Sequence, residues 1–204
     1  QWQPDYSFEV RRAGFFGAEY TSGTGFQSST PGFPNSVRPP EFGTGFLVGF
    51  SERLGPAGEN RGRDFWVYDL DTGVTTLVGL LGPEFQTQTG VRSGGARWQT
   101  QEGRVIGTAA RFHLVTGASN GSRAWYFDPT TMQSTAIGLN DAIHYGSEGY
   151  YWSVAEGYDK FGNVVGLVYR VQGLETNVGV DTWAFIRSTG QSVRTGLTEL
   201  PACN

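Results

Sequence analysis

Cysteine is almost absent from this chain of 204 residues, and the single thiol of Cys203 excludes an internal disulfide framework. Lysine is equally scarce: 14 of the 15 basic residues are arginine, and the arginines are not clustered. With a net charge of −4, the sequence therefore offers no basic surface for nucleic acid. No apolar run approaches the roughly 20 residues that a membrane-spanning helix needs. We accordingly expect no nucleic-acid partner and no membrane insertion.

The motifs of common enzyme sites are lacking too. The sequence has no phosphate-binding glycine loop, no dinucleotide fingerprint and no S-x-D-x-G-x-T-W box of sialidase-type propellers. Its two histidines, His113 and His144, stand far apart without neighbouring cysteines, so we expect loop or edge histidines and no zinc site. DLDTG (69–73) has alternating carboxylates, but the matching turns lose the second one, which favours a hairpin over a calcium loop. No metal, cofactor or catalytic residue is predicted.

Two pairs of glutamates occupy repeat-equivalent positions, Glu19 with Glu84 and Glu102 with Glu156. Paired carboxylates can hydrolyse glycosides. A catalytic pair, however, consists of one acid and one base in unlike environments, whereas copies at repeated positions are typical of turns and strand ends. A glycoside hydrolase-like enzyme is therefore the least favoured function.

Glycine and aromatic residues are abundant, with 31 glycines and 14% aromatics, which is typical of short strands joined by tight turns. Most of the chain repeats the segment 102–139 at a spacing of 58 or 59 residues. Its two clearest motifs are GRVIG (103–107), which recurs as GFLVG (45–49) and GNVVG (162–166), and AWYFD (124–128), which recurs as FWVYD (65–69) and TWAFI (182–186). A fixed period of this length indicates a propeller blade or a similar all-β unit.

The fold class expected from these repeats is all-β. Each repeat is interpreted as a four-stranded antiparallel meander, which buries one hydrophobic face only when it stacks on a neighbour. We predict a propeller-like arrangement of about three four-stranded blades plus a half unit, with three-fold β-prism-like sheets as the alternative. The single repeat domain 1–204 is divided into units of approximately 1–14 (partial), 15–79, 80–138 and 139–197 and a tail of 198–204.

The repeat, with its G-x-h-h-G strand, its W-h-h-D strand and its closing Gly-Leu, resembles the HAF repeat of bacterial extracellular proteins. The similarity covers nearly the whole chain. Where a typical HAF unit has His-Ala-Phe, this chain has Arg-Ala-Trp (123–125), Asp-Phe-Trp (64–66) and Asp-Thr-Trp (181–183). The resemblance implies a propeller-like β fold and a secreted or cell-surface bacterial protein, with the periplasm as another location, and it implies no particular reaction.

An arginine follows each repeated glycine motif by four residues, at Arg53, Arg111 and Arg170. As structural residues, these side chains would tie each unit to the next through backbone carbonyls or a carboxylate. As functional residues, they would form a ring that holds an anionic ligand. We favour the structural role, because recurrence in every unit is what a packing role predicts.

The aromatic residues divide into an expected core and an expected surface. The tryptophans of the repeated aromatic strand are predicted to be buried anchors at the interfaces of the units: Trp66, Trp125 and Trp183. Trp98 and Trp152 are aligned as a second equivalent pair. Aromatics in links and insertions form the candidate interaction surface: Trp2, Phe33, Phe42, Tyr150 and Tyr151.

The expected function is that of a non-catalytic extracellular β-repeat interaction module, a scaffold or assembly subunit that binds protein partners. A glycan-binding propeller lectin is the alternative. Because the alignment gives a half unit, three full units and a link, we do not expect the chain to close a propeller by itself. A protein partner or a homo-oligomer is therefore expected to cover the open blade edges, with residues 2–14 at the foreign contact.

Overall fold

The computed structural model describes residues 12–32, 45–100 and 102–196. In these ranges the chain is all-β, as predicted, and its only helices are single turns of 3₁₀ helix, so none is long and apolar enough to span a membrane. The strands are β1 (Ser29–Pro31), β2 (Phe46–Leu54), β3 (Asn60–Asp69), β4 (Thr75–Val78), β5 (Gly94–Gln99), β6 (Val105–Phe112), β7 (Ser119–Asp128), β8 (Gln133–Ile137), β9 (Tyr151–Tyr158), β10 (Val164–Gln172), β11 (Thr176–Ile186) and β12 (Gln191–Gly196). The 3₁₀ turns are η1 (Ala18–Tyr20), η2 (Pro83–Phe85) and η3 (Ala142–His144).

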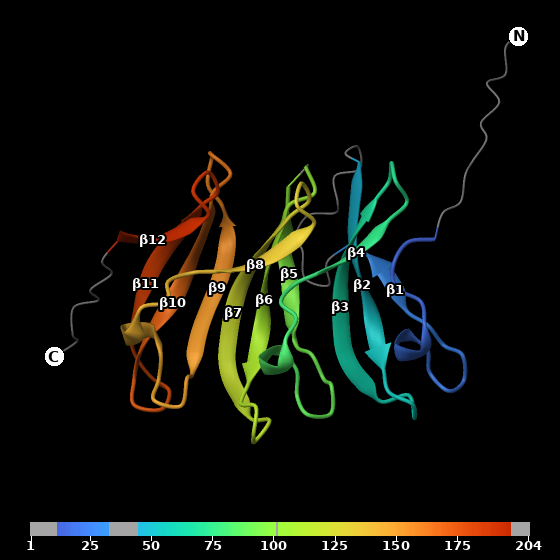
Figure 1. Cartoon of the computed structure of the whole chain (residues 1–204), viewed down its shortest axis with the longest axis horizontal. Helices are drawn as coiled ribbons and strands as arrows, with labels where there is room; N and C mark the ends of the chain where they lie inside the picture. Colours follow the sequence, from blue (N-terminus) through green and yellow to red (C-terminus); the bar gives the residue numbers. More distant parts are fainter. Residues whose placement is uncertain (1–11, 33–44, 101, 197–204) are drawn as a thin grey trace, which may run out of the picture.

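The strands form three antiparallel meanders that follow one another along the chain (Figure 1). Strands β1–β4 are the first meander, β5–β8 the second and β9–β12 the third. The second and third belong to one eight-stranded sheet, because β7 also pairs in parallel with β9 at Gly121 and Ser122. Each meander has the four antiparallel strands that the repeat predicts.

The two repeated motifs face each other across the second and third strands of each meander. Gly107 ends the motif GRVIG and is paired with Trp125, whose indole lies where a side chain at Gly107 would stand. The same pairing recurs between Gly49 and Trp66 and between Gly166 and Trp183. The motif needs its last glycine because the indole approaches the backbone closely. All three tryptophans are buried, with 1% of Trp66, 1% of Trp125 and none of Trp183 exposed, which confirms their predicted burial.

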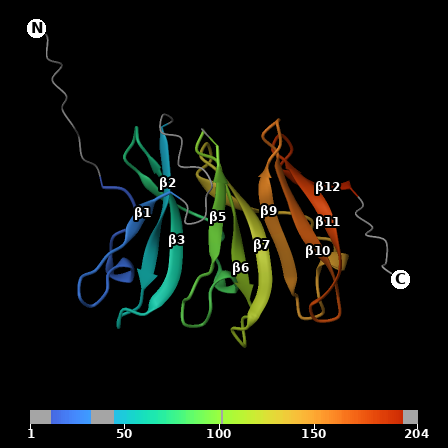
Figure 2. The same cartoon turned by 180° about the vertical axis from the view of Figure 1, so that it is seen from behind.

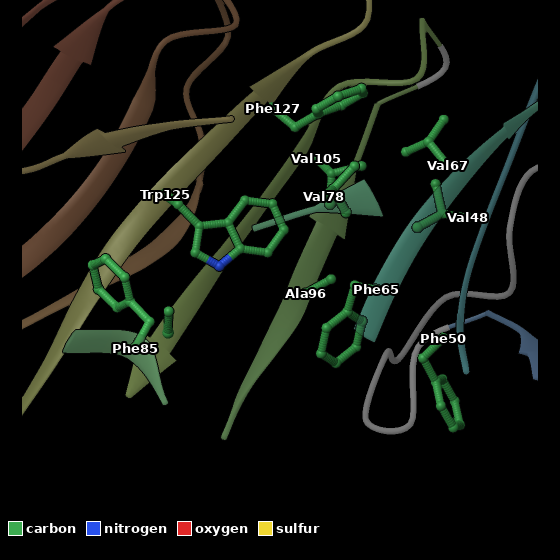
Figure 3. Packing of buried hydrophobic residues seen from close by; sticks show 11 residues of the cluster. Val48, Phe50, Phe65, Val67, Val78, Phe85, Ala96, Val105, Trp125 and Phe127 are labelled. Carbon is green, nitrogen blue, oxygen red and sulfur yellow. The ribbon is translucent and has the colours of Figure 1, made fainter. Parts of the chain in front are cut away.

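Two hydrophobic cores lie between consecutive meanders. Alternate residues of β7 serve both, because neighbouring side chains of a strand point to opposite faces. The first core joins Val48, Phe50, Phe65, Val67 and Val78 of the first meander to Phe85, Ala96, Val105, Ala109, Trp125 and Phe127 (Figure 3). The second joins Ile106, Ala124, Tyr126 and Ile137 to Leu139, Tyr151, Ala155, Val164, Val168, Trp183 and Phe185. Each large buried side chain contributes about 1.5 to 3 kcal/mol to this packing.

The hairpin after β3 follows the predicted turn chemistry. The carboxylate of Asp69 accepts hydrogen bonds from the backbone N–H groups of Asp71 (2.8 Å) and Thr72 (3.1 Å). Asp128 is its counterpart after β7 and accepts from the N–H of Thr130 at 2.9 Å. An aspartate that bonds backbone two residues ahead forms an Asx turn. DLDTG is therefore a hairpin turn.

The predicted equivalence of Trp98 and Trp152 is wrong. Trp98 lies near the end of β5 and pairs with Ile106, whereas Trp152 lies at the start of β9 beside Ser122. The sequence similarity around the two tryptophans is local. Strand β9 extends to Tyr158 and forms a longer hairpin with β10. The matching sequence therefore lies further from the hairpin turn in the third meander.

The meanders lie in an open row with the first and third at opposite ends (Figures 1 and 2). Over the described ranges, the sheets do not close into a ring. Most of the predicted half unit 1–14, including Trp2, lies outside the described residues. The third meander therefore has one face packed on the second meander and an opposite face at the end of the row.

Candidate functional site

The recurring arginines contact the link that leads into the next meander. Arg53 donates from Nη1 to the carbonyl oxygen of Gly90 at 2.6 Å, and Arg111 donates from Nη1 to that of Gly149 at 2.9 Å. Desolvation lowers the pKa of Arg111, as expected for a guanidinium packed between two meanders. In the first two meanders these are the contacts that the structural interpretation predicts. Each of these two arginines bonds a different link, so they do not form one anion site.

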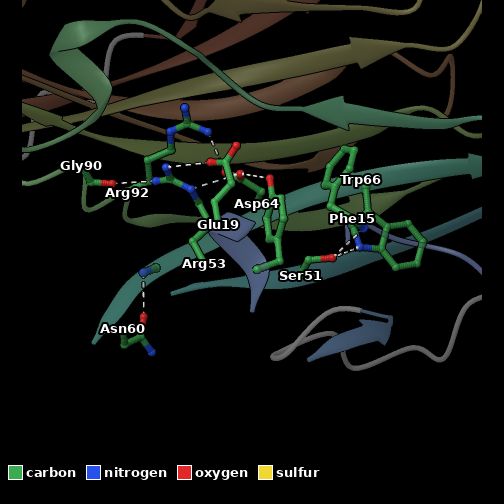
Figure 4. A network of polar contacts seen from close by, with 11 residues as sticks. Phe15, Glu19, Ser51, Arg53, Asn60, Asp64, Trp66, Gly90 and Arg92 are labelled. Carbon is green, nitrogen blue, oxygen red and sulfur yellow. Dashed lines mark hydrogen bonds and ion pairs between the residues drawn. The ribbon is translucent and has the colours of Figure 1, made fainter. Parts of the chain in front are cut away.

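A buried carboxylate organises the arginines at the first junction (Figure 4). Asp64 is 4% exposed. Its carboxylate oxygens lie 2.7 Å from Nη1 of Arg92 and 3.3 Å from Nε of Arg53, and Oδ2 accepts a hydrogen bond of 2.6 Å from the hydroxyl of Tyr20. Arg53 also lies 3.4 Å from Glu19. Because a buried carboxylate needs several compensating donors, this network ties η1, β2, β3 and the following link together.

The third meander has a related network that the sequence analysis missed. Asp181 is fully buried, with Arg194 at 3.3 Å, Arg170 at 3.6 Å and His144 at 3.1 Å. His144 is also fully buried, so the expectation of a loop or edge histidine is wrong for it. The position of His144 in the repeat indicates this role, because His144 is the last residue of η3 just as Tyr20 is the last residue of η1.

The second histidine is a loop residue, as expected. His113 lies between β6 and β7, and its Nδ1 accepts long hydrogen bonds from the N–H groups of Val115 and Thr116, both at 3.3 Å. These bonds shape the loop. Within the described ranges, no group of three histidine, cysteine or acidic side chains could hold a metal ion.

The aromatic surface expected from the sequence is only partly described. Trp2, Phe33 and Phe42 lie outside the described residues. Tyr151 is fully buried, which contradicts its place on an interaction surface. It begins β9 against Gly121, and its hydroxyl donates to the carbonyl of Leu139 at 2.6 Å. Tyr151 is therefore a core residue of the second junction.

Tyr150, by contrast, is half-buried and lines a groove of about 330 Å³ between the second and third meanders. The groove is lined by His113, Thr116, Ala118, Ser119, Asn120, Glu148, Tyr150, Leu174 and Glu175. Desolvation raises the pKa of Tyr150, and the negative charge of Glu175 adds to it. The groove thus gathers one aromatic ring, one imidazole and two carboxylates from two meanders. In the link of the first junction, the side chain of Gln88 donates to the carbonyl of Val115 at 2.8 Å.

The predicted equivalence of Glu102 and Glu156 is wrong, because Glu102 lies in the turn after β5 whereas Glu156 lies within β9. The glutamates serve separate ion pairs. Glu156 lies 2.9 Å from Arg97, and Glu102 lies 3.1 Å from Arg104. Glu19 reaches Arg53 in the first meander. Each carboxylate thus belongs to a different strand end or turn, and none of these contacts places one of them beside another.

The end of the row forms a largely apolar surface, which we call the outer face. Val164 and Val168 of β10 point into the second core, so the alternate residues of the strand point away from it. Trp152 and Tyr169 stack there with ring centroids 3.9 Å apart and an interplanar angle of 18°. The outer face consists of Trp152, Val154, Val165, Leu167, Tyr169 and Val193. In the second meander, the residue that corresponds to Val165 is Ile106, which the third meander buries completely.

Comparison of the chain with models of protein families, with curated proteins and with solved structures finds no match.

Proposed function

We propose that the chain is a non-catalytic β-repeat interaction module of a secreted or cell-surface protein, and that the outer face binds a protein partner. In this proposal the meanders are blades of a propeller-like arc. The observation that carries it is the outer face itself. A stacked tryptophan and tyrosine beside aliphatic residues on a sheet is typical of a protein-binding surface, because such faces cost free energy in water.

The organisation of the row supports the same function. Every junction between consecutive meanders buries an apolar face, and the third meander continues this pattern on its outer face. The buried polar networks at Asp64 and Asp181 consist of ion pairs and hydrogen bonds that join elements of the fold. Their geometry supports a role in holding the row together.

Protein capture tests the proposal. Immobilised chain is incubated with an extracellular extract of the organism that makes it, and a variant with Leu167→Asp on the outer face is compared with Val115→Asp. Val115 is 76% exposed on a loop away from this face and is the matched control. We expect capture to be lost with Leu167→Asp and kept with Val115→Asp, provided both variants melt near the parent temperature. Equal capture by parent and Leu167→Asp would reject the proposal.

A second function, glycan binding, is favoured by the groove at Tyr150. Sugars present an apolar ring face and several hydroxyls, and the groove offers an aromatic ring beside His113, Glu148 and Glu175. A glycan array probed with the parent chain and with Tyr150→Ala tests this function. Phe161→Ala is the control, because Phe161 is a 73% exposed aromatic that does not line the groove. Binding that survives Tyr150→Ala would exclude this groove as the site.

A further inference from the structure

A glycine of the third strand lies directly against the next meander at both internal junctions. Gly62 of β3 bridges in parallel to Arg92, whose N–H donates to the carbonyl of Arg61 at 3.0 Å. Gly121 of β7 bridges in the same way to Tyr151. Both glycines have positive φ, and any side chain on either would collide with the carbonyl oxygen of the neighbouring meander. The junction therefore requires glycine at this position.

A second glycine of each meander donates to the fourth strand of the next. The N–H of Gly79 donates to Oγ of Ser134 in β8 at 2.9 Å. The N–H of Gly138 donates to Oγ of Ser192 in β12, also at 2.9 Å. Together with the arginine bonds to Gly90 and Gly149, each junction thus has three contacts between fixed repeat positions.

The third meander carries the same residue types at the corresponding positions, namely Arg170, Gly179 and Gly196, although neither glycine has the positive φ of its counterparts. Arg170 pairs with Asp181 as Arg53 pairs with Asp64, and at the first junction this pairing coexists with the bond to the next link. The guanidinium of Arg170 lies against Gly179. At the two internal junctions, the corresponding space beside Gly62 and Gly121 is filled by a backbone carbonyl of the next meander.

The first meander carries the complementary residues. Gly25 corresponds to the carbonyl acceptors Gly90 and Gly149, and it has positive φ like Gly90. Gln27 corresponds to Arg92, which bridges Gly62. Thr75 on β4 corresponds to Ser134 and supplies a hydroxyl at that position. The two ends of the row are therefore complementary in the same three contacts that join the meanders internally.

We infer that the outer face of the third meander binds the first meander of a second copy of the chain. In this contact Arg170 donates to the carbonyl of Gly25, the backbone at Gly179 pairs with Gln27, and the N–H of Gly196 donates to Thr75. The inference rests on the proposed function and names the protein partner. Because donor and acceptor surfaces differ, the contact is heterologous, and two chains with three meanders each close a ring of six, within the four to eight blades of known propellers.

The test uses one variant at each end. Gly179→Val blocks pairing with Gln27, while in its own chain the three atoms nearest to the added side chain belong to the guanidinium of Arg170. Thr75→Lys places a long charged side chain at the opposite end. Gly95→Val is the matched control, since Gly95 is a strand glycine with open space around it. Masses are measured by analytical ultracentrifugation over a range of concentrations, and circular dichroism verifies that each variant is folded.

We expect the parent chain and Gly95→Val to form pairs of twice the 22.2 kDa of one chain. Gly179→Val and Thr75→Lys should each dissociate at concentrations at least tenfold higher than the parent. A mixture of the two variants should pair more tightly than either variant alone, because one of the two contacts in the mixed pair joins an intact donor end to an intact acceptor end. A parent chain that stays monomeric, variants that pair like the parent, or a mixture that pairs no better than the separate variants would each overturn the inference.

The capture experiment remains a separate readout. If the parent chain is monomeric but still captures another protein, and Leu167→Asp abolishes this capture, self-association is overturned and the proposed function stands. If neither pairing nor capture depends on the outer face, both proposals fail.

Discussion

His144 and Asp181 form a fully buried pair in the third meander, with Nε2 and Oδ2 3.1 Å apart. The hydroxyl of Tyr20 meets Asp64 at 2.6 Å in the corresponding place of the first meander. In both cases the last residue of a 3₁₀ turn is fixed to an acid on the third strand. The contact therefore anchors the link that enters a meander to the sheet of that meander.

Replacing His144 with alanine should lower the free energy of unfolding by about 1 to 3 kcal/mol, the cost of depriving a buried acceptor of its donor. His113→Ala should cost less than about 1 kcal/mol, because its loop is outside the core. Urea unfolding monitored by tryptophan fluorescence measures both. Equal effects of the two substitutions would contradict a structural role for the His144 contact.

The sequence predicted the repeated strands well because their motifs report local geometry. A glycine opposite a tryptophan is needed in every meander, so both residues recur at a fixed spacing and can be recognised without a structure. The Asx turns at Asp69 and Asp128 are also set by a few neighbouring residues. These features depend on short-range contacts.

Tryptophan truncation tests the cores. Trp125→Ala and Trp183→Ala should each lower the free energy of unfolding by about 3 to 5 kcal/mol, since both indoles are buried between meanders. Trp98→Ala is the control and should cost less than about 1 kcal/mol, because Trp98 is 40% exposed. Thermal and urea unfolding measure the losses. A cost for Trp98→Ala as large as for Trp125→Ala would contradict the assigned cores.

The polar networks were harder to predict because equivalent positions carry different residue types in different meanders. Where the first and third meanders have an acid, Asp64 and Asp181, the second has Arg123, which donates to the hydroxyl of Tyr145 at 2.8 Å. Phe85 ends η2 in the second meander and packs into the first core instead of meeting a carboxylate. The outer face and the groove also depend on which residues face away from a core. Strand register decides this, as the misaligned Trp98 and Trp152 show.

Arg111→Met should weaken the second junction. The guanidinium donates to the carbonyl of Gly149, and a hydrogen bond from a charged group contributes about 1.5 to 3 kcal/mol. Arg61→Met is the control, because Arg61 forms an exposed ion pair with Glu59 inside the first meander that should contribute at most about 1 kcal/mol. Hydrogen exchange at the amides around Gly149 should quicken in Arg111→Met alone. Unchanged exchange there would contradict the role assigned to the arginine.

Acid should weaken the hairpin turns. The backbone N–H of Thr72 lowers the pKa of Asp69 below its ordinary value of 3.8; desolvation opposes this effect, and the N–H of Asp71 and the hydroxyl of Thr72 lower the pKa further. Because the pKa is lower in the folded chain, the carboxylate stabilises the fold at pH values above 3.8 and loses this contribution as the pH falls through the folded value. Asp69→Asn keeps an oxygen that accepts the same hydrogen bonds but does not titrate. The difference in unfolding free energy between parent and variant should therefore be largest near pH 6 and shrink toward pH 2 in urea titrations.

Glu175→Gln, which removes one exposed negative charge at another turn, is the control for net charge. A parent-to-variant difference that stays constant from pH 6 to pH 2 would show that the ionised form of Asp69 does not stabilise the turn.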